Sequence, residues 1–127
     1  MFAIQKEVLS DLSLKILQGR AAEVEWEAPV GRYHTADVSH QFPNHKRAFF
    51  LKLPAGTGIH RHRDAGDVQT DHIVVATNPQ CLSWWEEDGA EKSMHMELGH
   101  RYTVERTLLH WAHNGGETDR IHLLLEY

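Results

Sequence analysis

The chain has 127 residues, of which 41% are hydrophobic, and a formal net charge of −5 with histidine neutral. This length and composition predict one folded domain over residues 1–127 and exclude an intrinsically disordered chain. The acidic balance provides no electrostatic basis for binding nucleic acid or an anionic membrane, so we expect neither as a partner.

Cysteine use and the first residues bear on where the protein works. Cys81 is the single cysteine, so no disulfide can form within the chain. Lys6 and Glu7 stand where a signal peptide would need an apolar segment, and no stretch approaches the length of a transmembrane helix. We therefore expect a cytoplasmic protein.

The N-terminal segment has two interpretations. Val8, Leu12 and Ile16 recur at helical spacing within residues 5–18, whereas Leu12, Leu14 and Ile16 also alternate as in a strand. The sequence is therefore compatible with a short N-terminal helix. Three histidines further on are assigned to a polar loop before the core strands: His34, His40 and His45.

The rest of the chain is typical of short strands separated by turns. Residues 23–27 alternate polar and apolar, which predicts a half-buried strand closed by Pro29, and residues 47–53 form a mostly apolar run. Asp88-Gly89 is a hairpin signal. Further strands are expected over residues 59–64, 71–76, 80–86, 93–98, 102–105 and 121–127. About eight such strands predict a mainly β fold, a double-stranded β-helix (a jelly roll or cupin-like barrel) of two packed antiparallel sheets.

A candidate metal site combines three residues from two distant segments. His62 and Asp64 are two positions apart in a predicted strand, so both side chains point to one face. His60 would point the same way and competes as a ligand. His110 comes from a distant strand. Two imidazoles and one carboxylate suit a non-haem Fe(II) oxygenase and leave coordination positions open for substrate.

Several longer motifs resemble one known family. They are Pro54-Ala55-Gly56-Thr57 before His62-Arg63-Asp64, the run from Asp71 to Pro79, and the closing pattern His-x-x-x-Asn-x-x-x-x-x-Arg that begins at His110. Together they make residues 48–127 similar to the aspartyl/asparaginyl β-hydroxylase-like Fe(II)- and 2-oxoglutarate-dependent oxygenases. Residues before 48 match nothing that we recognise.

The resemblance implies roles for individual residues. His62, Asp64 and His110 would be the iron ligands, and Arg120 would bind the distal carboxylate of 2-oxoglutarate through its planar fork. His72 would be a second co-substrate contact. Asn114 matches a recurring family position beside the cofactors, where we expect structural support.

The same resemblance implies a reaction with dioxygen that hydroxylates a C–H bond. The family members that act on peptidyl Asp or Asn lack the carboxylate ligand, so Asp64 makes the chain similar to members with a full triad. The substrate is left open among an amino acid, a peptide side chain and a small metabolite, and a homo-oligomer is also left open. We expect substrate contacts from Arg32, Tyr33, His34 and Arg47, and either Trp84 or Trp85 could wall the pocket.

Two alternatives compete with the oxygenase interpretation. One is a cupin of other chemistry, an isomerase or a 2-oxoglutarate-independent dioxygenase, in which His60, His62, Asp67 and His110 bind the metal. That hypothesis leaves Arg120 unexplained. The other is a non-catalytic small-molecule-binding protein, which would have no need of an arginine opposite an open metal face. Loss of metal on His60→Ala would favour the cupin.

Overall fold

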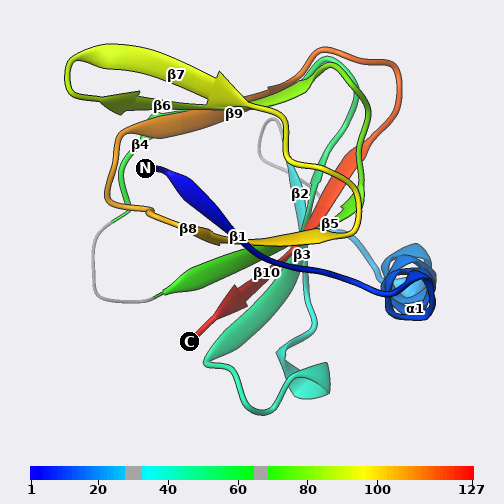
Figure 1. Ribbon diagram of the computed structural model, residues 1–127. Helices are drawn as coiled ribbons and strands as arrows, with labels where there is room; N and C mark the ends of the chain where they lie inside the picture. The colour runs from blue at the N-terminus through cyan, green and yellow to red at the C-terminus, as the bar shows by residue number, and fades with distance from the viewer. Residues whose placement is uncertain (28–32, 65–68) are drawn as a thin grey trace.

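Two antiparallel sheets face each other in the computed structural model, which describes residues 1–27, 33–64 and 69–127 (Figure 1). The larger sheet has six strands, in spatial order β1 (Ala3–Val8), β8 (His100–Val104), β5 (Thr70–Ala76), β10 (Arg120–Glu126), β3 (Arg47–Leu53) and β2 (His34–Asp37). The smaller sheet has four, in order β4 (Gly58–His62), β9 (His110–Asn114), β6 (Cys81–Glu87) and β7 (Ala90–Met94). The predicted mainly β, double-stranded β-helix fold is confirmed.

One helix, α1 (Asp11–Glu23), covers the outside of the larger sheet (Figure 1). It begins where it does because the Ser10 hydroxyl accepts a hydrogen bond from the Ser13 N–H, at 3.1 Å. Leu17 and Ala21 are buried against the sheet. A 3-10 turn, η1 (Ser39–Gln41), lies between β2 and β3. No helix in the described part of the chain has the length and apolar character needed to cross a bilayer.

In the larger sheet, the strand β10 is buried on both faces. Along β10, Leu123 and Leu125 point outward into the cluster beneath α1. Arg120 and Leu124 point inward and line the space between the sheets. This arrangement turns the inner face of β10 into one wall of a pocket and gives the outer face to the main core.

Two sequence predictions before β3 were wrong. Residues 23–27 do not form a strand: α1 runs to Glu23, Val24 closes it, and within residues 24–27 only Glu27 forms a bridge, to Thr35. The helix extends to Glu23 because its packing against the sheet stabilises it more than the alternation of five residues favours a strand. Pro29 lies outside the described residues. His34, assigned to a loop, belongs to β2, which pairs with β3 through its whole length.

Later strand boundaries follow the turns between them. Asp88 and Gly89 have φ of 53° and 75°, the left-handed conformations that a tight two-residue hairpin needs. The strand after this turn therefore starts at once, as β7 over Ala90–Met94, rather than at the predicted residues 93–98. The predicted strand over residues 47–53 coincides with β3.

Candidate metal centre and pocket

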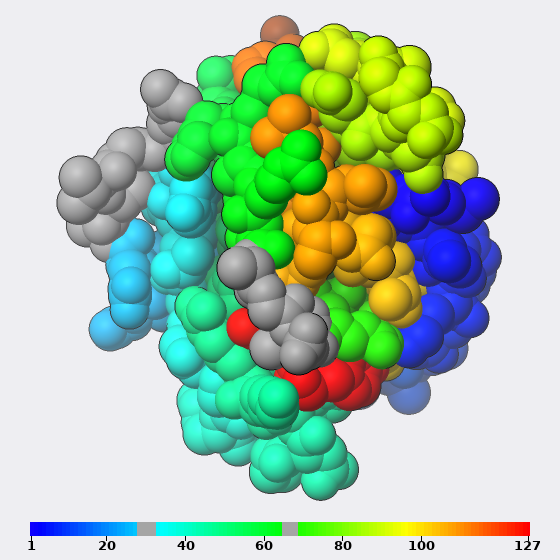
Figure 2. All heavy atoms as spheres, turned by 90° about the vertical axis from the view of Figure 1, so that its left-hand side faces the viewer, coloured from blue at the N-terminus to red at the C-terminus, as the bar shows by residue number. Residues whose placement is uncertain are grey.

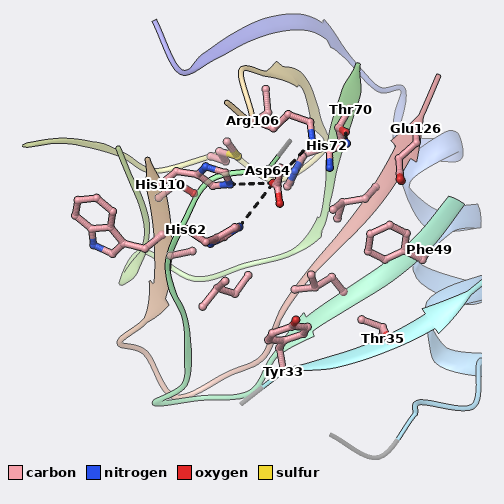
Figure 3. Close-up of a pocket in the computed structure, with 18 of the residues that line it drawn as sticks. Tyr33, Thr35, Phe49, His62, Asp64, Thr70, His72, Arg106, His110 and Glu126 are labelled. Carbon is pink, nitrogen blue, oxygen red and sulfur yellow. Dashed lines mark hydrogen bonds and ion pairs between the residues drawn. The ribbon is translucent and has the colours of Figure 1, made fainter. Parts of the chain in front are cut away.

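A pocket of about 320 Å³ opens between the inner faces of the two sheets (Figure 3). Both sheets contribute to its wall, the larger through β3, β5 and β10 and the smaller through β4 and β9. Figure 2 shows the face on which β4 and β9 lie side by side, with the C-terminal end of the chain lower in the view. Each of the predicted metal and co-substrate residues except Asn114 lines this pocket: His62, Asp64, His72, His110 and Arg120.

Three potential ligands converge on one point of the pocket wall. His62 ends β4 and His110 begins β9, and the two residues are paired in the sheet. Their Nε2 atoms lie 3.7 Å and 3.5 Å from Oδ2 of Asp64. One ligand atom from each residue lies within 4.8 Å of the others, a spacing that a single metal ion can bridge (Figure 3). Among the described residues this is the one cluster of its kind.

Backbone carbonyls orient both imidazoles for coordination. Nδ1 of His62 lies 2.7 Å from the His60 carbonyl oxygen, and Nδ1 of His110 lies 2.7 Å from that of Leu108. Because a carbonyl only accepts, Nδ1 carries the hydrogen in each ring and Nε2 keeps its lone pair, directed toward Asp64. Burial lowers the pKa of His110, which favours the neutral form that binds metal.

A β-bulge separates His60 from the cluster. Ile59 pairs with Ala112 and His62 pairs with His110, so three steps on β4 match two on β9. The extra residue reverses the alternation, and both Ile59 and His62 therefore line the pocket while His60 is exposed. The His60 ring lies beside that of His62, with centroids 5.8 Å apart, but it is exposed and lies outside both the pocket wall and the ligand cluster.

Arg120 is a buried cation at the far end of the pocket. Its side chain is 5% exposed, and its Nε donates to Nε2 of His122 at 3.0 Å. Nη1 is buried without a hydrogen-bond partner, and no described carboxylate lies within ion-pair distance. Burial lowers its pKa to about 10, so it remains charged at neutral pH. A buried guanidinium that lacks an anion is costly unless a ligand supplies one.

His72 reaches the same pocket from β5. Its Nδ1 lies 3.1 Å from Nδ1 of His122, and burial, followed by the charge of Arg120, lowers its pKa to about 3. His122 is also held neutral by burial, which lowers its pKa well below the usual value. The pair therefore offers neutral hydrogen-bonding groups beside Arg120 and adds no second positive charge.

Asn114 supports the pocket from behind and does not line it. Its Nδ2 donates to the carbonyls of Leu53 and Thr118, at 2.9 Å and 2.8 Å, and its Oδ1 accepts from Asn78 and Gly116. The side chain is fully buried and engaged at both ends. It therefore joins β9 to the end of β3 and to the turn before β10, and has no free group for a co-substrate.

Sequence reasoning missed several pocket residues, and two of them contact the predicted metal ligands. Arg106 follows β8, and its Nε lies 3.8 Å from Oδ2 of Asp64, while its backbone oxygen accepts from the Asp64 N–H at 3.0 Å. Its same-face spacing with Val104, which also lines the pocket, was an available signal. Phe2 packs against His110 in a tilted arrangement, with ring centroids 5.3 Å apart. Nothing in the N-terminal pattern predicts that contact.

The predicted substrate contacts divide into two groups. Tyr33 and Arg47 line the pocket, whereas His34 does not. Arg32, and Asp67 of the cupin hypothesis, lie outside the described residues.

Neither tryptophan of β6 walls the pocket. Trp85 is buried and stacks on Phe2, with ring centroids 5.4 Å apart. Trp84 stacks on Trp111, with ring centroids 6.2 Å apart. The suggestion that either residue forms part of the pocket wall was therefore wrong, because both are used in aromatic packing.

One family model matches most of the chain. The model described as Aspartyl/Asparaginyl beta-hydroxylase matches residues 20–127, which extends the similarity well before residue 48. A search of curated proteins finds no match.

Solved structures with the same fold include an oxidoreductase of the 2OG-Fe(II) oxygenase family from Burkholderia pseudomallei, with a TM-score of 0.82 at 10% identity over 98% of this chain and 82% of that one. HygX from Streptomyces hygroscopicus, solved with nickel and 2-oxoglutarate bound, has a TM-score of 0.79 at 7% identity over 98% and 81% of the two chains. A predicted oxalate decarboxylase from Thermotoga maritima has a TM-score of 0.60 at 17% identity over 84% and 95%. At these identities the likeness shows the shared fold.

Proposed function

The chain belongs to the aspartyl/asparaginyl β-hydroxylase family, and from that premise we propose that it is an Fe(II)- and 2-oxoglutarate-dependent oxygenase. It would hydroxylate a C–H bond of an amino acid, a peptide side chain or a small metabolite, with dioxygen as oxidant. Two imidazole nitrogens and a carboxylate oxygen suit Fe(II) in a facial triad, so His62, Asp64 and His110 would hold the metal. Iron with 2-oxoglutarate supplies the oxidising chemistry that no side chain can provide.

The unpaired charge of Arg120 carries the proposal. A metal-binding protein of other chemistry has no need of a buried guanidinium in the same pocket, with an Nη1 that has no partner. A carboxylate bound there would satisfy the charge and the unbonded N–H together. 2-oxoglutarate is a dicarboxylate, so one end would bind the metal while the other pairs with Arg120 in the same pocket.

The chain's own residues would orient the co-substrate and exclude water. Arg120 would hold the distal carboxylate, with neutral His122 fixing the guanidinium by accepting a hydrogen bond from its Nε. Neutral His72 would donate a hydrogen bond to the same ligand without adding a second positive charge. Apolar side chains line the wall between these groups and the metal, which favours a dry site: Leu51, Ile59, Ala112 and Leu124.

The cupin ligand set is not favoured by the geometry. His60 is exposed, and its contribution to the centre is the backbone oxygen that accepts from Nδ1 of His62. His60→Ala keeps that oxygen and is therefore a matched control for ligand substitutions. Formation of succinate from 2-oxoglutarate distinguishes an oxygenase from a protein that only binds small molecules, because a binding protein forms none.

The test is an anaerobic titration of metal-free protein with Fe(II) and 2-oxoglutarate, followed by the visible charge-transfer band of the chelate. We expect the band in the wild type and in His60→Ala, and its loss in Asp64→Ala. Arg120→Lys keeps the charge but loses the fork, so 2-oxoglutarate should bind roughly 10- to 100-fold more weakly while iron binding is unchanged.

Admission of air should then yield succinate from 2-oxoglutarate. Iron binding without a band, or loss of metal in His60→Ala, would contradict the proposal. A band without succinate under any condition would favour a binding protein.

A further inference from the structure

A row of charged side chains lies at the opposite end of β10 from Arg120. In the larger sheet Thr70 pairs with Glu126, and Glu126 pairs with Arg47, so these neighbours share the inner face. All of them line the pocket. Six residues of strand separate Arg120 from Glu126, which is about 20 Å of backbone. The charges at this end therefore lie away from the group assigned to the co-substrate.

Glu126 brings to the pocket a negative charge whose Oε2 accepts no hydrogen bond. Its Oε2 is buried without a hydrogen-bond partner. Nη1 of Arg47 lies 3.9 Å away, which is ion-pair distance but too long for a hydrogen bond. The Arg47 guanidinium instead lies over the ring of Phe49, 4.2 Å from its centroid. Glu126 thus keeps one acceptor position open, facing the pocket.

Arg106 brings to the same region a positive charge whose Nε donates no hydrogen bond. Its Nε is buried without a hydrogen-bond partner, and its Nη1 donates to the Thr70 hydroxyl at 3.2 Å. The nearest carboxylate is Asp64, at 3.8 Å and assigned to the metal. Since Thr70 is bonded to Arg106 and paired with Glu126, the two opposite charges flank one residue, with adjacent strands about 5 Å apart. Figure 3 shows Arg106, Thr70 and Glu126 along one side of the pocket.

We propose that the substrate is a free α-amino acid, with its ammonium group on Glu126 and its carboxylate on Arg106. This inference rests on the proposed function, and it narrows the substrate class. A residue inside a peptide carries neither charge and would leave both buried groups without partners. The pocket, at about 320 Å³, is near the lower limit for ligand sites and must also hold the co-substrate, so the substrate is small.

The experiment uses protein loaded anaerobically with Fe(II) and 2-oxoglutarate, titrated in a calorimeter with each of the common L-amino acids. Every amino acid that binds is repeated as its N-acetyl derivative and as its carboxamide. We expect each blocked form to bind roughly 10- to 100-fold more weakly than the free amino acid, because one charge-assisted contact is lost.

Variants assign the two contacts. Glu126→Gln should weaken the free amino acid by a similar factor and leave the N-acetyl form unaffected. Arg106→Gln should likewise weaken binding of the free amino acid and leave binding of the carboxamide unaffected. Glu91→Gln, an exposed carboxylate on β7 that pairs with Arg61 outside the pocket, is the matched control and should change neither affinity.

Failure of this inference is distinguishable from failure of the proposed function. A normal chelate band with no amino acid bound would contradict the proposal of a free amino-acid substrate. So would blocked forms that bind as tightly as the free amino acids. An Arg106→Gln variant that loses the band instead of amino-acid affinity overturns the carboxylate contact, because it places Arg106 on the co-substrate. If no band forms, the proposed function fails. The same calorimetry still tests whether a free amino acid binds through both of its charged groups, since Glu126 and Arg106 are not metal ligands.

Discussion

Asp71 is expected to be the most important polar residue for stability outside the pocket. It is fully buried on the outer face of β5, and its carboxylate accepts from Arg101 Nε at 2.7 Å, Thr103 Oγ1 at 2.8 Å and Tyr127 Oη at 3.0 Å. Lys6 of β1 lies 3.4 Å away. One side chain therefore ties β1, β5, β8 and the last residue together.

Asp71→Ala should lower the free energy of unfolding by about 3 kcal/mol at pH 7. Each hydrogen bond to a charged acceptor contributes about 1.5–3 kcal/mol, but the three are not additive, and the partly exposed Arg101 regains water when the carboxylate is removed. Urea unfolding followed by tryptophan fluorescence measures the change. Glu117→Ala, on an exposed loop, is the control and should change stability by less than about 0.5 kcal/mol.

The same variant has a predicted pH signature. Burial raises the pKa of Asp71, but hydrogen bonds from Thr103 and Arg101 outweigh it and leave the pKa below its usual 3.8. A lowered carboxyl pKa stabilises the fold above the unfolded value, and this stabilisation is lost as pH falls through the folded value. The difference between wild type and variant should therefore be constant above about pH 5 and shrink below pH 3.8. A difference below 1 kcal/mol at neutral pH, or one that grows in acid, would refute the reasoning.

Three further outcomes are expected. Phe2→Ala should cost about 3 kcal/mol and weaken metal binding because the ring supports His110, whereas equal metal affinity in the variant would show that the contact is only structural. Gly58→Ala should destabilise the fold by about 1–3 kcal/mol, because the added Cβ would lie 2.6 Å from a backbone oxygen of β9. Gly19→Ala should stabilise the fold, because the added Cβ in α1 meets open space. Calorimetric melting compares the two variants. Burial lowers the pKa values of His72 and His122, so below about pH 6.5 the unfolded chain binds protons that the folded chain does not. The free energy of unfolding should therefore fall as the pH is lowered from about 6.5 toward 3. Equal urea midpoints at pH 7 and pH 5 would argue against buried neutral rings.

Local patterns were sufficient where neighbouring residues decide the outcome. The apolar run of β3 and the Asp88-Gly89 turn act over a few positions, and both were placed from sequence. Alternation along β10 likewise puts pocket residues on one face and core residues on the other. In each case the period of the strand or the φ preference of a residue is a property of the local chain.

Contacts between distant segments explain the errors. The length of α1 depends on the sheet that it covers, and this overrode the alternation of residues 23–27. The role of Phe2 depends on β1 meeting β8 almost a hundred residues later, which brings the ring to His110. No periodicity within the N-terminal segment carries that information.

The sequence by itself determined the fold class, the family resemblance and the residue types from which a metal and a dicarboxylate site can be built. Only the tertiary structure decided which of those residues meet. The bulge opposite His110 turns His60 to solvent and His62 inward, and burial without an anion distinguishes Arg120 from an ordinary surface arginine. The physical reason is that register, burial and unpaired charge belong to pairs of strands, and a pair does not exist until the chain has folded.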